Sequence, residues 1–89
     1  METQVICPII HGNGDTEETL MRNLQAAFIA VEKAGDALRM CRPHGRNYYP
    51  VDGLLEKAVA QHQERDRKLV EVGESLMLEM RAITTRLSA

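Results

Sequence analysis

One short segment of the chain, residues 42–51, gathers the residue types most suited to recognising another molecule. It combines positive charge, hydrogen-bond donors and aromatic rings, a mixture that can bind phosphate, single-stranded bases or an acidic protein surface. The same residues could instead be structural. The tyrosines would then close the end of a helical hairpin, and the arginines would satisfy the last carbonyl groups of the preceding helix. The candidate partner-binding residues are Arg42, His44, Arg46, Asn47, Tyr48 and Tyr49.

The cysteines and two of the histidines form two pairs with the chemistry of zinc ligands. Cys7 and His11 precede a predicted helix, whereas Cys41 and His44 follow it. At helical rise, that helix separates the two pairs by about 35 Å, so one chain cannot bring all four side chains to one ion. Only an antiparallel dimer could do so. We therefore predict no metal site and no cofactor.

His62 and Asp66 lie one helical turn apart and could take part in acid–base chemistry. No Ser or Cys nucleophile is expected beside them. A simpler interpretation is a polar interruption of a helical seam, which fixes register or oligomeric state at a cost in stability. The sequence also lacks a phosphate-binding glycine loop and a nucleophile elbow. These observations predict that the protein is not an enzyme.

The elements that must position these residues begin with an extended apolar arm over residues 1–14, where Pro8 opposes regular helix. A first helix is predicted from about 16 to about 41, within a unit 15–41, with Asp15 or Thr16 as its N-cap. Its apolar seam has an unbroken heptad spacing. The seam consists of Leu20, Leu24, Ala27, Val31, Ala34, Leu38 and Cys41.

A second helix is predicted over residues 52–87, capped by Asp52. The short 42–51 connection, at the tip, favours antiparallel neighbours. The longer second helix should then overhang the start of the first, where the arm residues Val5, Ile6, Ile9 and Ile10 would cover Met80, Ile83 and Leu87. The seam of this helix has the same spacing but a polar middle. It consists of Leu55, Val59, His62, Asp66, Leu69, Gly73, Leu76, Met80, Ile83 and Leu87.

Length and composition predict one all-α domain, a two-helix antiparallel hairpin over residues 1–89. The chain is 44% hydrophobic and 27% charged, which is typical of folded proteins. With one Phe, two Tyr and no Trp, its core must be mainly aliphatic. Two helices bury only one stripe each, so a lone hairpin of this size is marginally stable. We therefore predict a homodimer that forms a four-helix bundle.

Charge and hydropathy restrict the classes of partner and the compartment. The net charge of −2 argues against nonspecific binding to nucleic acid or membranes through bulk electrostatics. No apolar run approaches the roughly 20 residues needed to span a bilayer. The first residues lack the basic flank of a secretory signal, and two cysteines form no disulfide framework. A cytoplasmic protein without membrane contact is expected.

The hexapeptide Gly45-Arg46-Asn47-Tyr48-Tyr49-Pro50, followed by His62-Gln63 in a charged helix, resembles a group of short bacterial and phage proteins. They share a Gly-Arg-(Asp/Asn)-Tyr-Tyr-Pro motif between two helices. The resemblance covers residues 20–80, and only the hexapeptide is specific; His44 departs from the Asn usual in the group. Because the group has no assigned activity, the resemblance implies a hairpin and a phage or prophage context, but no catalytic role.

Together these observations predict a small non-catalytic helical interaction protein. It would act as a homodimer and present the 42–51 connection or a helical face to a protein partner. The alternative is a nucleic-acid-binding accessory protein that uses the basic connection. The two differ in salt dependence, because phosphate contacts release counterions and weaken steeply as salt rises.

Overall fold

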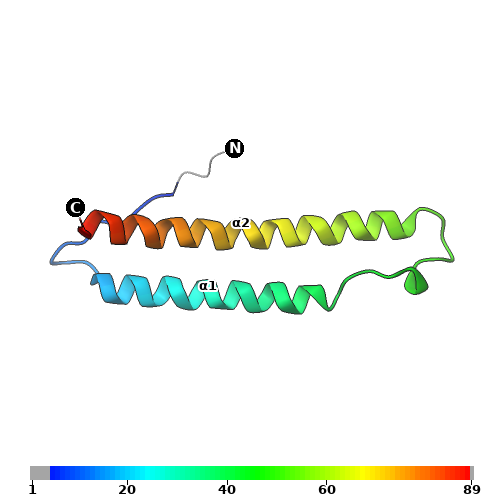
Figure 1. Cartoon of the computed structure of the whole chain (residues 1–89), viewed down its shortest axis with the longest axis horizontal. Coiled ribbons are helices and arrows are strands. Elements are labelled where there is room, and N and C mark those ends of the chain that lie inside the picture. The colour runs from blue at the N-terminus through cyan, green and yellow to red at the C-terminus, as the bar shows by residue number, and fades with distance from the viewer. Residues whose placement is uncertain (1–4, 89) are drawn as a thin grey trace.

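The computed structural model describes the backbone of residues 5–88 and the side chains of residues 5–85. Two helices, α1 (Glu17–Arg39) and α2 (Leu54–Ser88), lie side by side in opposite directions (Figure 1). A 3₁₀ turn, η1 (Gly45–Asn47), lies between them, and residues 5–88 contain no strand. The molecule is 62 Å long. The predicted all-α antiparallel hairpin is confirmed.

The N-terminus of α1 forms where the sequence predicts it. Thr16 has an extended backbone, and its hydroxyl accepts a hydrogen bond from the Thr19 N–H at 3.2 Å. Glu17 and Glu18 follow in the first turn, where the helix dipole favours acids. The helix ends at Arg39, before the predicted 41. Pro43 has no N–H and disfavours helix at Arg42, so the helix cannot continue through the connection.

The face of α1 that packs on α2 is rotated from the predicted seam. Four predicted members, Leu20, Leu24, Val31 and Leu38, are half-buried, but Ala27, Ala34 and Cys41 are exposed. Phe28 and Gly35 are half-buried in place of the two alanines. The large Phe28 ring lies over Gly73 of α2, where a methyl group would be 3.7 Å from it. The heptad pattern placed Ala34 on the buried face of α1, whereas the structure places Gly35 on its half-buried side.

The predicted seam of α2 is correct: every member from Leu55 to Ile83 is buried or half-buried, and the Leu87 side chain lies outside the described residues. The predicted start is wrong. Asp52 lies in the preceding turn, and the Gly53 carbonyl accepts the hydrogen bond of the Lys57 N–H at 3.4 Å. Gly53 adopts φ +78°, a left-handed conformation that glycine tolerates best, and this turns the chain into the helix.

The overhang of the longer helix lies at the opposite end from the predicted one. Beyond α1, the chain runs on beside the first turns of α2 before it reverses (Figure 1). A Cβ on Gly45 would lie 4.0 Å from Leu55, and Pro43 lines a pocket with Val59. The residue before Pro43 is restricted to extended conformations, and His44 is itself extended. The 42–51 connection is therefore mostly a flank of α2, not a compact tip.

The arm doubles back beside the C-terminal part of α2 (Figure 1). Val5 and Ile10 are half-buried, as predicted, whereas Ile6 and Ile9 are exposed, which contradicts the prediction. Ile83 is only 1% exposed, and it is the one large side chain fully buried among those described. Two helices alone cannot enclose a side chain on all sides. We infer that the arm supplies a third layer over this end of α2.

Candidate functional site

The predicted partner-binding residues remain together in the 42–51 connection, and most of them face solvent. Tyr49 is 78% exposed, whereas Tyr48 is half-buried and faces the protein. The two neighbouring rings therefore differ: the Tyr48 ring is partly covered by the protein, and the Tyr49 ring is free for contact. The exposed members are Arg42, His44, Arg46, Asn47 and Tyr49.

Backbone hydrogen bonds hold the connection in one shape. The Gly45 carbonyl accepts hydrogen bonds from the N–H groups of Tyr48 at 3.0 Å and Tyr49 at 2.9 Å. The Asn47 N–H donates to the His44 carbonyl at 3.2 Å, and the Asn47 amide nitrogen lies 3.3 Å from His44 Nε2. These bonds define η1 and position the exposed side chains without help from a partner.

The connection is locally basic. Residues 37–51 contain no acid, and Arg42 and Arg46 form no ion pair with any residue in the described part of the chain. Arg39, at the end of α1, differs because it pairs with Asp36 one turn earlier. The two arginines of the connection are therefore available to an anionic group, whether a carboxylate or a phosphate.

His62 and Asp66 lie in a shallow pocket between the connection and α2. The pocket has a volume of about 350 Å³, and both residues are half-buried. The hairpin register brings them close to Arg39 and Arg42, and none of the lining residues is a Ser, Thr or Cys. His62 and Asp66 therefore form a polar interruption of the α2 seam, and the pocket that they line contains no hydroxyl or thiol nucleophile.

The structure also contains a groove that the sequence patterns did not predict. It lies along one side of the helix pair, has a volume of about 270 Å³, and passes over the two mid-helix glycines, Gly35 and Gly73. The available signal was those glycines, since each costs about 1 kcal/mol relative to Ala in a helix. The acids on its rim are Glu32, Asp36, Asp66 and Glu74.

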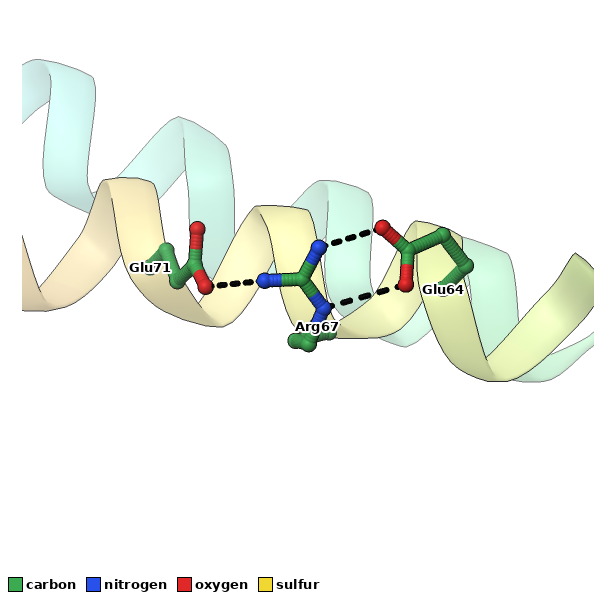
Figure 2. A network of polar contacts seen from close by, with 3 residues as sticks. All are labelled: Glu64, Arg67 and Glu71. Carbon is green, nitrogen blue, oxygen red and sulfur yellow. Dashed lines mark hydrogen bonds and ion pairs between the residues drawn. The ribbon is translucent and has the colours of Figure 1, made fainter. Parts of the chain in front are cut away.

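An ion-pair network lies on the exposed surface of α2 (Figure 2). Arg67 donates to Glu64 through Nε at 3.0 Å and also pairs with Glu71. The hydrogen bond from Arg67 lowers the pKa of Glu64, and Glu64 in turn raises the pKa of Arg67. Such exposed pairs contribute little stability. The network is consistent with the predicted solvent face of this stretch.

The cysteines do not meet. Cys7 and Cys41 are free thiols on segments that precede and follow α1, and Cys41 is exposed. Across the described residues, no three His, Cys, Asp or Glu side chains gather in an arrangement that could hold a metal ion. The two predicted ligand pairs therefore stay separate within one chain.

Comparisons with known proteins add no relative. No family model, curated protein or solved structure that was compared with this chain matches it. The resemblance of the hexapeptide to short phage and bacterial proteins therefore stays a prediction. Neither described helix is long and apolar enough to cross a bilayer.

Proposed function

We propose that this protein is a non-catalytic helical interaction protein that associates with itself into a four-helix bundle and presents the 42–51 connection to a protein partner. The observation that carries the proposal is the amount of apolar surface left uncovered. Only Ile83 is fully buried among the described large side chains, whereas Leu24, Val31 and Leu38 of α1 stay half-buried. Apolar burial stabilises by roughly 25 cal/mol per Å², so covering this surface favours association.

The outer side of α1 supports self-association. Ala27 and Ala34 of α1 are spaced by seven residues, lie next to the face that packs on α2, and are exposed. Cys41, just beyond the end of α1, continues the spacing and is also exposed. Small side chains at this spacing allow a second helix to approach closely, and the heptad spacing suits a bundle. We place the contact between two copies on this stripe.

Sedimentation equilibrium tests the bundle. At protein concentrations of about 10 to 500 µM, we expect a species of twice the 10.0 kDa chain mass. Ala34→Glu should shift the equilibrium to monomer, because a charge would be buried between the copies. The matched control is Gln25→Glu, at an exposed position on the opposite side of α1 from Ala34, and this variant should stay dimeric. A wild-type monomer at the highest concentration would contradict the proposal.

Affinity capture from the native host tests the role of the connection. We expect Tyr49→Ala to reduce capture of a partner protein while the circular dichroism spectrum stays helical, because this ring is exposed. Tyr48→Ala is the structural comparison, since Tyr48 is half-buried and its loss should lower helicity. Undiminished capture by the Tyr49→Ala variant would remove the connection from the interface.

The exposed arginines and Tyr49 favour one alternative, an accessory protein that binds single-stranded nucleic acid through charge and stacking. Fluorescence anisotropy with a labelled single-stranded oligonucleotide separates the two. If the alternative is right, the protein binds the oligonucleotide, the binding weakens steeply as salt rises, and the Arg46→Glu variant does not bind. No change in anisotropy at low salt would eliminate it.

A further inference from the structure

We propose that the groove between α1 and α2, centred on Gly35 and Gly73, binds a basic amphipathic helix of a partner protein. The inference deepens the proposed function and rests on it, because it names a second contact surface and the chemistry of its occupant. It concerns a different surface from the α1 stripe that we assign to self-association and from the 42–51 connection.

The groove has an apolar floor, and part of the space above that floor is unoccupied. Gly73 is buried, and a Cβ there would lie 3.7 Å from both Phe28 and Val31, so the floor is closed at this point. A Cβ on Gly35 would meet nothing within 4 Å, so space remains above this glycine. Val70 is 50% exposed and Met77 45% exposed along the same groove. Their uncovered surface is available to apolar side chains of a ligand.

The dimensions of the groove fit a short helix. Its lining extends from Phe28 to Arg39 on α1 and from Asp66 to Met77 on α2. At helical rise, each stretch is about 17 Å long, which corresponds to about three turns of a ligand helix. A helix of that length presents apolar side chains three and four residues apart on one face, the usual way in which amphipathic helices occupy grooves.

The charge of the rim selects the ligand. Four acids line the groove, and its one basic residue, Arg39, is already paired with Asp36. Glu32 and Glu74 are exposed and form no ion pair within the described residues. A helix with Lys or Arg beside its apolar face would complement this rim. Two copies facing each other through the groove would bring like charges together, which disfavours self-association here.

Direct titration tests the inference. The probe is a fluorescein-labelled synthetic peptide of about 14 residues, with Leu at helical spacing on one face and Lys on the other. The control peptide carries Glu in place of each Lys. We expect the lysine peptide to bind the full chain at least about tenfold more tightly than the glutamate peptide, and less tightly at high salt. Equal binding of the two peptides would overturn the inference.

Two variants locate the binding. Gly35→Leu fills the open space above the floor and improves helix propensity, so it should abolish binding while the protein stays helical. Glu74→Lys should weaken binding several-fold by removing rim charge. Glu56→Lys is the matched control: it makes the same charge change on the same helix, at an exposed position outside the groove that has no ion pair among the described residues, and should bind nearly as the wild type. Unchanged binding by Gly35→Leu would overturn the inference.

The outcomes separate this inference from the proposed bundle. A dimer that does not bind the lysine peptide would overturn the groove inference alone. If the wild type is a monomer that binds the peptide, and the Gly35→Leu variant does not bind it, the groove inference is supported and the proposed bundle is overturned. If Glu74→Lys changes the sedimentation mass and leaves peptide binding unchanged, the groove's occupant is a second copy and the inference is wrong.

Discussion

The two ends of the hairpin are built differently. At the arm end, α2 contacts α1 on one side and is covered on another, since Ser75, Glu79 and Ala82 are half-buried although they lie off the seam. At the connection end, the first turns of α2 face an irregular segment, Leu54 is exposed, and His62 occupies the seam. Among the side chains of residues 5–85, an apolar side chain is fully buried only at the arm end, at Ile83.

This difference shows what a two-helix protein needs for a core. Facing seams alone leave most side chains half-buried, and a third segment is required to complete the enclosure. The arm supplies that segment at one end, whereas the connection, with two prolines and a glycine, replaces α1 at the other without adding a layer. Stability should therefore be concentrated near Ile83, and the connection end should open more readily.

Truncating Ile83 should have the largest effect. Ile83→Ala truncates the one large side chain that is fully buried in the part of the chain that the structure describes, and such truncations cost about 2 to 5 kcal/mol. In a hairpin this small, we expect most of the helicity to be lost at room temperature, as measured by circular dichroism with urea denaturation. Leu78→Ala, on the exposed side of the same helix, is the control and should cost little. Similar losses for the two variants would abolish the distinction between the ends.

The arm itself is tested by two adjacent residues. Ile10→Asp places a charge on a half-buried side chain and should destabilise the protein by about 1 to 2 kcal/mol. Ile9→Asp makes the same change at a position that is 72% exposed and should leave the urea midpoint nearly unchanged. If the two variants unfold at the same urea concentration, the arm does not cover α2.

The connection end can be made to resemble the arm end. His62→Leu replaces a polar member of the α2 seam by an apolar one and should stabilise the protein by about 1 kcal/mol. The control is Gln61→Leu, one residue earlier on the exposed surface, which should have little effect on stability. A lower thermal midpoint for His62→Leu would mean that the polar pocket beside Arg39 and Arg42 stabilises the fold.

The smallest effect is expected from the ion pairs between the two ends. Arg67 lowers the pKa of Glu64 in the folded protein, so the ionised pair stabilises the fold above the ordinary pKa of 4.5. This contribution is lost as the pH falls through the lowered pKa. The wild type should therefore lose slightly more stability than Arg67→Gln between about pH 7 and pH 3. Arg65→Gln, an exposed arginine outside the network, should follow the wild type.

The helices and the α2 seam were predictable because their signals are local. Thr16 caps α1 through its own side chain, and the spacing of three and four residues in α2 marks one continuous face. The α1 face was less predictable, because its apolar arc is wide enough to offer two seams. One includes Ala27 and Ala34, and the other includes Phe28 and Gly35. Only the position of Gly73 on the opposite helix decides between them.

The register of the hairpin and the groove could not be predicted from spacing. A connection rich in proline looks like a compact turn in sequence, but the extended His44 carries the chain along α2 before it reverses at Gly53. The groove arises from two glycines on different helices, and the sequence does not indicate that they lie near each other. The exposed cluster in the 42–51 connection was predictable, since its residues are adjacent in the chain.

The arm's return beside α2 also determines how far the molecule can reach. The end of α2 and the turn that joins the arm to α1 lie at the same end of the rod, remote from the connection (Figure 1). Anything held at this end of the rod would therefore lie on the order of 50 Å from residues 42–51, which is the length of α2. Used in this way, the hairpin is a spacer that displays its arginines and Tyr49 well away from its point of attachment.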